Sequence, residues 1–321
     1  MKFNFLNPQT KDNPISSLTM LIIGVIILSL QDSLIKYMSS ETSFWQLQFI
    51  RSIGNILLLF LIARLTNGIS ILMPIKWKPV YFRALMMTTC MFCFFAASPK
   101  LSFAQMAAGL YTFPIFVSCL AIVFLGERIG VWRTFALFLG SFGAILILEP
   151  WSENFTLLQI LPIMAGFFFA CNIVLIRKYC RQESVMSLTF AVGIMFFFSA
   201  SLGVMFFELF FQNTLFRETS PFVFIGWPEL TLIIFAFCFS CSILNVSGNI
   251  LLAKAYQTAE SSWLAPMDYS YLIFATIWGK IFFDVWPSLI NLIGMFFISI
   301  SGILIAFRER KNLKLINKRM P

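Results

Sequence analysis

The sequence of 321 residues contains no histidine, and charged residues make up only 12% of it, against about 25% in soluble proteins. Without histidine, the chain lacks the commonest metal ligand and the commonest catalytic base near neutral pH. With so few charged side chains, a soluble domain of this length could not cover its surface with polar atoms. The sequence therefore excludes a soluble metalloenzyme, a secreted disulfide scaffold and a disordered chain.

Apolar side chains dominate what is present, at 59% of the residues, with 40 Phe among them. Windows of about 20 residues, the length that crosses the hydrocarbon of a bilayer, predict helices because lipid does not tolerate unpaired strands. The expected fold is an all-α polytopic membrane protein with ten transmembrane helices. The expected helices are 17–38, 43–66, 79–98, 101–125, 130–149, 157–178, 186–211, 229–256, 260–283 and 287–307.

Lysine and arginine indicate how these helices are oriented. With the N-terminus in the cytoplasm, most of the 23 basic residues fall in inner loops and tails, as cytoplasmic segments prefer. The net charge of +9 therefore reflects membrane topology, and we expect no nucleic-acid partner. Residues 1–16 and 308–321 are expected to be cytoplasmic tails, the second basic enough to contact an anionic lipid leaflet.

A weak internal repeat divides the chain. Residues 34–49 and 175–190 share Leu, Ile, Ser, Leu and Phe at matching positions. This match places five helices in 17–149 and five in 157–307. Because five is an odd number, we expect the second half to be inverted in the membrane. Inverted repeats are typical of secondary transporters, whose binding sites lie near the midplane between the halves.

Ionisable groups inside the expected helices are the strongest functional signal, because they are costly there unless paired or hydrated. Asp32 and Arg51 lie at similar depth in the first and second helices, and Lys36 follows Asp32 by one helical turn. We expect these three residues to line an outward-facing cavity and to bind solute. The alternative is a structural ion pair, with Lys36 extending to the membrane interface.

A second acid, Asp268, lies in an aromatic segment of the ninth expected helix. Proline removes a helix hydrogen bond, and tyrosine and tryptophan combine an apolar face with a polar group. We therefore expect Asp268 to contact solute as well, together with aromatic residues beside broken helices. The alternative is a kinked packing helix in which Asp268 bonds a neighbouring Ser or Asn. The expected aromatic contacts and helix-breaking prolines are Tyr111, Trp263, Tyr271, Pro114 and Pro266.

Other polar residues give weaker signals. Asn172 and Asn245 are more commonly hydrogen-bond partners between helices than ligands. Two CxxC spacings lie inside apolar helices, where polar partners for a metal are scarce, so we expect neither a metal nor a cofactor. The chain also lacks the nucleotide-binding and hydrolase motifs. Proton or counter-solute coupling and a homodimer are both compatible with the sequence.

Several motifs carry a family resemblance. They are residues 31–37, 49–51, 124–128, 265–272 and 282–287. Together they resemble the drug/metabolite transporter (DMT) superfamily and its EamA branch, with a pattern similar to that of bacterial S-adenosylmethionine uptake carriers. The resemblance implies a multi-pass protein of the bacterial inner membrane with ten helices in two inverted halves.

The expected function is secondary active transport by alternating access. The expected solute is a small polar organic metabolite that is amino-acid-like, S-adenosylmethionine-like or a related zwitterion or cation. The expected partners of the protein are this solute and the lipid bilayer. An exporter of amino acids or toxic metabolites is the alternative within transporters. Outside that class stand an intramembrane enzyme, against which the missing histidine and nucleophile motif argue, and a passive channel or packing scaffold.

Overall fold

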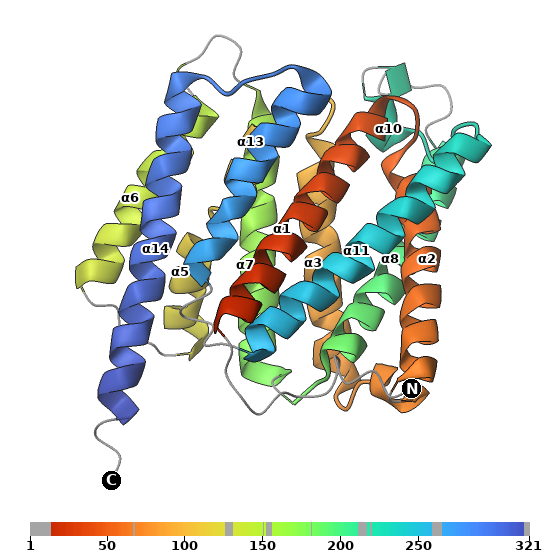
Figure 1. Ribbon diagram of the computed structural model, residues 1–321. Helices are drawn as coiled ribbons and strands as arrows, with labels where there is room; N and C mark the ends of the chain where they lie inside the picture. The colour runs from red at the N-terminus through yellow and green to blue at the C-terminus, as the bar shows by residue number, and fades with distance from the viewer. Residues whose placement is uncertain are drawn as a thin grey trace.

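The structure is a computed structural model that describes residues 14–66, 68–125, 131–149, 151, 156–180, 182–210, 217–218, 220–258 and 265–317. Every regular element in these ranges is a helix, so the all-α prediction is confirmed (Figure 1). The α-helices are α1 (Pro14–Tyr37), α2 (Phe44–Leu65), α3 (Trp77–Ala96), α4 (Phe103–Leu110), α5 (Phe113–Leu125), α6 (Val131–Leu148), α7 (Leu161–Tyr179), α8 (Val185–Phe210), α10 (Pro221–Phe224), α11 (Leu232–Thr258), α13 (Ser270–Phe283) and α14 (Leu289–Asn317). Short 3-10 turns are η2 (Met38–Ser40), η3 (Ile69–Leu72), η4 (Leu157–Ile160) and η5 (Ala265–Tyr269).

Seven helical segments in the described chain are long and apolar enough to cross a membrane, so the protein is a multi-pass membrane protein. Two further apolar helices, Thr134–Leu148 and Leu289–Leu304, are shorter. The seven segments are Ile15–Ser40, Phe44–Leu65, Trp77–Ala96, Phe103–Phe124, Leu157–Ile176, Val185–Phe210 and Leu232–Ala255. Most expected ranges match observed helices to within a few residues, with three exceptions. The range 101–125 is divided into α4 and α5 at Tyr111 and Thr112, and the range 260–283 has the 3-10 turn η5 before α13. The last helix continues beyond 307 to Asn317, into the expected tail.

Hydrogen-bonding side chains mark where several helices begin. Ser43 precedes α2, and its hydroxyl accepts a hydrogen bond from the backbone of Gln46. Ser102 precedes α4 and forms a capping box with Gln105. Such caps satisfy backbone N–H groups that the first turn of a helix leaves free. Two of the bundle's corners are therefore specified by short-range sequence.

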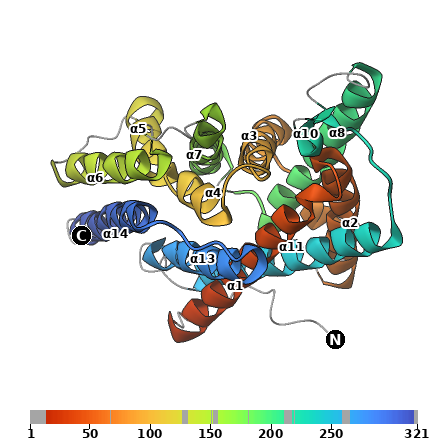
Figure 2. The ribbon, with the colours of Figure 1, turned by 90° about the horizontal axis from the view of Figure 1, so that it is seen from above.

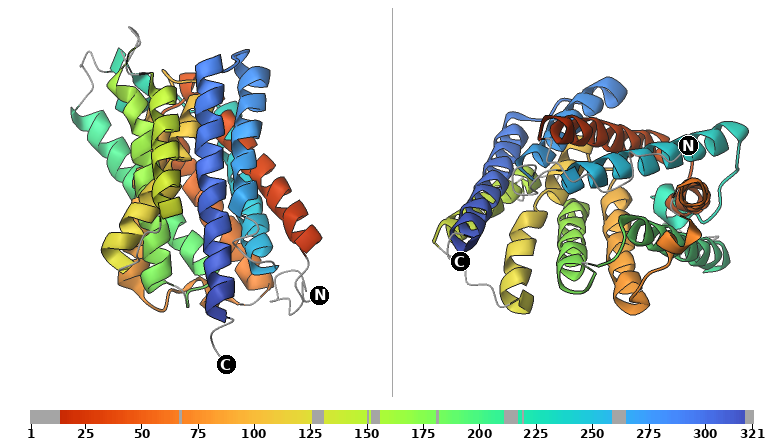
Figure 3. Two further views of the ribbon diagram at one scale, coloured as in Figure 1. Left: turned by 90° about the vertical axis from the view of Figure 1, so that its left-hand side faces the viewer. Right: turned by 60° about the horizontal axis from the view of Figure 1, so that its bottom comes forward.

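The helices form two rows. Seen from above, α14, α13, α1 and α11 make one row and α6, α5, α7 and α3 make the other, with α4 between them (Figure 2). The α2–α8 pair closes one end and the α6–α14 pair closes the other, an arrangement that a second direction also shows (Figure 3). Residues of the two sequence halves meet across the space between the rows.

The main helix pairs of the first sequence half have counterparts in the second. In one row α1 packs against α11 and α13, and in the other α7 packs against α3, α4 and α5. The matched stretches also make matched contacts. Ser43 donates to the carbonyl of Gly226 at 2.8 Å, and Ser184, its equivalent in the repeat, donates to the carbonyl of Ile71 at 2.7 Å.

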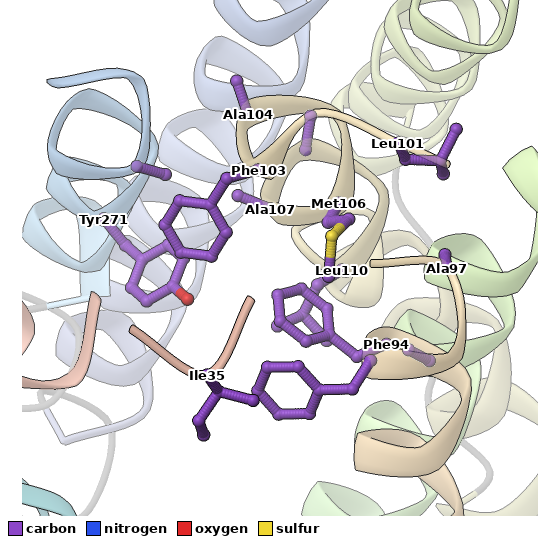
Figure 4. Packing of buried hydrophobic residues seen from close by; sticks show 14 of the residues in the cluster. Ile35, Phe94, Ala97, Leu101, Phe103, Ala104, Met106, Ala107, Leu110 and Tyr271 are labelled. Atoms are coloured by element: carbon purple, nitrogen blue, oxygen red, sulfur yellow. The ribbon is translucent and has the colours of Figure 1, made fainter. Parts of the chain in front are cut away.

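The largest apolar core lies between the rows and supports the residues considered next. Figure 4 shows Ile35 of α1 near Phe94 of α3, with Phe103 of α4 beside Tyr271 of α13. All four side chains are buried. Burial of aromatic side chains of this size stabilises a core strongly. The polar groups around Tyr271 are therefore held by a rigid setting.

Candidate functional site

Asp32 is the centre of a polar network on the inner side of α1. Its carboxylate oxygens accept a hydrogen bond from the Tyr271 hydroxyl at 2.7 Å and from Gln31 Nε2 at 2.6 Å. The side chain is only half-buried, so part of it remains open to a solute. The structure thus brings together Asp32 and Tyr271, two residues that the sequence analysis selected on different helices.

The network continues through amide side chains. Gln31 Oε1 accepts from Asn245 Nδ2 at 2.8 Å, and Asn245 Oδ1 accepts from Asn55 Nδ2 at 3.3 Å. It therefore links α13, α1, α11 and α2 in a single path. The sequence analysis assigned Asn245 to interhelical bonding and passed over Asn55. Both residues could have been selected from the sequence, because both are amides on apolar helices.

Aromatic rings cover the carboxylate end of this network. Tyr111, at the break between α4 and α5, stacks on Tyr271 with ring centroids 5.2 Å apart and planes at 23°. Tyr269 meets Tyr111 edge-on at 5.5 Å, and Phe103 lies 6.3 Å from Tyr271. A stacked pair of tyrosines beside a carboxylate provides both apolar faces and hydrogen-bonding groups for a planar or cationic solute.

Arg51 is buried on α2, with 3% of its surface exposed. Its guanidinium lies 5.7 Å from the ring centroid of Phe196 on α8. Among the described residues, no ion pair joins Arg51 to an acid, and Asp32 acts on it only through the electrostatic field. The two residues therefore form the predicted neighbourhood of opposite charge without a direct contact.

Lys36 points away from Asp32. Its ammonium donates to the backbone carbonyls of Ser98 and Leu101, the second at 2.7 Å, and lies 5.1 Å from the centroid of the Phe283 ring. These contacts place Lys36 at the corner between α3 and α4. The predicted three-residue cluster is thus divided, and Lys36 lies at a separate opening.

That opening is a cavity of about 370 Å³ between the end of α1, the α3–α4 corner and the end of α13. Besides Lys36, its lining includes Lys100, Ser102, Gly279 and Phe283. Two ammonium groups and several backbone carbonyls give it a mixed polar character. A solute approaching Asp32 from this end of the bundle would meet these groups first.

The remaining predicted residues lie at the helix breaks. Asp268 and the backbone of Pro266 belong to η5, where a 3-10 turn replaces the expected α-helix. Pro114 lies in the first turn of α5, immediately after the break at Tyr111. Trp263 lies outside the described residues. The two proline segments are therefore both associated with interrupted helices, one in each sequence half.

One segment of the chain matches a known family model. Residues 15–149 match the model of the EamA-like transporter family. The predicted resemblance is confirmed over these residues, which make up less than half of the chain.

Curated proteins that are similar to this chain carry different solute names. A riboflavin transporter of Vibrio cholerae is 25% identical over 57% of the chain and 55% of its own length. An S-adenosylmethionine uptake transporter of Rickettsia bellii is 26% identical over 63% of this chain and 62% of its own length. A pseudopaline exporter of Pseudomonas aeruginosa is 22% identical over 87% of this chain and 92% of its own length. The matches thus cover little more than half of the first two relatives.

A solved crystal structure supports the fold of this chain. It superposes with a TM-score of 0.60 at 14% identity and covers 93% of this chain and 99% of its own. At this level of identity the match shows the helical architecture alone.

Proposed function

We propose that this protein is a secondary active transporter that moves a small polar organic solute across the bacterial inner membrane by alternating access. The observation that carries the proposal is the half-buried Asp32, bonded to Tyr271 at 2.7 Å, with the ring of Tyr111 stacked on that of Tyr271. An ionisable group inside a membrane bundle marks a solute or ion pathway. We assign solute binding to Asp32, Arg51, Tyr111, Asp268 and Tyr271, and from the sequence also to Trp263, which lies outside the described residues.

The proposal includes ten transmembrane helices arranged as two inverted five-helix halves, 17–149 and 157–307. Two observations support this arrangement: α1 packs against α11 as α7 packs against α3, and Ser43 and Ser184 make similar contacts to opposite loops. Both observations are expected when two similar halves surround one site. In this arrangement the halves move against one another, and the breaks near Pro114 and Pro266 act as bending points.

The termini are proposed to lie in the cytoplasm. In Figure 1, α14 ends at the lower side of the bundle, where α3 also begins. Lys76 directly precedes α3, and Lys78 lies in its first turn. Basic residues at this side follow the preference for cytoplasmic loops. Lys36 and its cavity then face the periplasm and form the outer entrance.

The test is solute exchange in proteoliposomes. Purified protein is assayed for counterflow of riboflavin, S-adenosylmethionine and individual amino acids, with solute loaded on either side so that uptake and export are both detected. We expect Asp32→Asn to reduce exchange at least about tenfold, because charge-assisted hydrogen bonds contribute about twice what neutral ones do. Asp284→Asn removes a carboxylate outside the site and is the matched control.

Two results would contradict the proposal. One is exchange by Asp32→Asn at the wild-type rate. The other is the absence of saturable exchange for every solute of the panel in either direction, which a passive channel or a packing scaffold would give.

A further inference from the structure

A group of buried polar atoms on α2 is left unused by the contacts described so far. Gln48, Arg51 and Asn55 follow one another at three- and four-residue spacing, so they share one face of the helix. They are 1%, 3% and 6% exposed. Among the described residues, four of their side-chain atoms have no hydrogen-bond partner: Gln48 Nε2, Gln48 Oε1, Arg51 Nη1 and Asn55 Oδ1.

Inside a membrane, a buried polar atom without a hydrogen-bond partner costs free energy of folding. The charged guanidinium of Arg51 has the largest such cost of the three side chains. The ring of Phe196 meets only its apolar face, at 5.7 Å. Asp32 is not the direct partner of Arg51 in this conformation, because no ion pair joins the two side chains among the described residues. The open Nη1 atom of Arg51 therefore needs an acceptor that the described residues do not supply.

These atoms are continuous with the site around Asp32. Asn55 is the end of the amide path that runs through Asn245 and Gln31 to Asp32. Arg51 lies one turn before Asn55 on α2, and Gln48 lies one turn before Arg51. The face of α2 with the unbonded atoms and the stacked tyrosines therefore lie at two ends of one polar region.

We propose that this face of α2 binds the α-amino carboxylate head group of the solute. This inference rests on the proposed transport function and names the class of solute. Arg51 Nη1 and Gln48 Nε2 donate to the carboxylate, while Gln48 Oε1 and Asn55 Oδ1 accept from the ammonium. Two donors beside two acceptors complement a zwitterion, whereas a simple anion would call for donors alone. The rest of the solute extends towards Asp32 and Tyr271.

The head-group site is enclosed in the observed conformation, because its open atoms have almost no accessible surface. The surrounding helices hold it tightly. Ser242 of α11 donates to the backbone carbonyl of Arg51 at 3.1 Å, and a Cβ added to Gly54 would meet Ser242 Oγ at 2.4 Å. The solute must therefore enter while α2 and α11 are apart, which agrees with alternating access.

The experiment compares solutes that differ in one charged group. Phenylalanine is paired with phenethylamine, which lacks the carboxylate, and with 3-phenylpropanoate, which lacks the ammonium. S-adenosylmethionine is paired with its decarboxylated form. Affinity is measured from the thermal shift of the purified protein in detergent and from inhibition of counterflow. We expect the intact solute of at least one pair to bind about tenfold or more tightly than its truncated partners.

Two variants separate binding from folding. Gln48→Met keeps the volume and removes two open atoms, so we expect an unchanged or higher melting temperature without solute, together with loss of the preference for the zwitterion. Ser52→Ala is the control, because the Ser52 hydroxyl bonds only the carbonyl of Phe49 in its own helix, at 2.8 Å. This variant should keep the preference.

The inference is overturned if truncated solutes bind as tightly as intact ones, or if Gln48→Met keeps the wild-type preference. It is also overturned if chloride or acetate raises the melting temperature as much as the zwitterion, since a simple anion then fills the site. In all three cases saturable exchange of some solute can persist, so the transport proposal stands. Absence of exchange for every solute would instead reject the transport proposal itself.

Discussion

At the scale of single residues, the environment of each charged side chain decides what it can do. Asp32 has a tyrosine hydroxyl and an amide as partners and remains half-buried. Lys36, one helical turn away, bonds two backbone carbonyls at a corner of the chain. The same helix face thus carries one group available to a solute and one that also stabilises a loop.

Lys36→Met tests this division. The substitution leaves the carbonyls of Ser98 and Leu101 without their charged donor, so we expect the free energy of unfolding to fall by about 1–3 kcal/mol. Because Lys36 lines the outer cavity, KM for transport should rise while turnover is kept. Thermal unfolding in detergent and initial rates in proteoliposomes measure the two effects. Loss of turnover at unchanged stability would instead place Lys36 beside Asp32 in the transport step.

At this scale, the functional residues could be predicted from the sequence better than their partners. Asp32, Arg51 and Tyr271 stand out because polar groups are rare on apolar helices. Their partners depend on the path of distant segments: the bond from Tyr271 to Asp32 joins residues 239 positions apart. The carbonyls that hold Lys36 belong to a corner that no side-chain pattern describes. Gln48 was not predicted, because the sequence around an amide does not show whether its side-chain atoms lack a hydrogen-bond partner.

At the scale of helices, apolar windows predict the elements well, because both length and hydrophobicity are set by the bilayer. Such windows do not show the break at Tyr111 and Thr112, since 101–125 is apolar on average and contains no charged residue. Local chemistry explains the break. The Thr112 hydroxyl donates to the carbonyl of Gly109 at 2.7 Å, and Pro114 offers no backbone N–H to continue the ladder.

The α6–α14 pair shows how small residues set the distance between helices. A Cβ added to Gly294 would lie 2.8 Å from the carbonyl oxygen of Gly143, and one added to Gly143 would lie 2.7 Å from that of Gly294. The two backbones therefore touch, as in membrane helix pairs built on small residues. This contact closes one end of both rows.

Gly294→Val should separate this pair. The branched side chain would overlap the backbone of α6, and we expect a loss of about 1–3 kcal/mol in the free energy of unfolding. Gly279→Ala on α13 is the control, because its Cβ would meet its nearest neighbour at 3.7 Å and alanine is the better helix former. Thermal unfolding in detergent checks both. Equal melting temperatures for the two variants would show that the backbones of α6 and α14 are not in contact.

At the scale of the whole molecule, the matched halves explain why one site lies between two rows. Ser43 and Ser184 are equivalent in the sequence repeat, and each caps a helix while bonding a loop of the other half. In an inverted arrangement these two corners lie on opposite sides of the membrane. Each corner then ties the halves together at one surface, and a transporter that alternates would loosen one corner while the other holds.

The same arrangement predicts which loops are accessible from each side. In a variant whose seven cysteines are replaced by alanine or serine, a single cysteine is placed at Glu229, before α11, or at Lys76, before α3. Both positions are exposed. With the termini in the cytoplasm, a membrane-impermeant thiol reagent added to whole cells should label Glu229→Cys and spare Lys76→Cys, while permeabilised cells should show both labelled. Labelling of both positions in intact cells would reject the inverted topology, because the corners at Ser43 and Ser184 would then not face opposite compartments. Labelling of Lys76→Cys alone would instead reject the cytoplasmic placement of the termini.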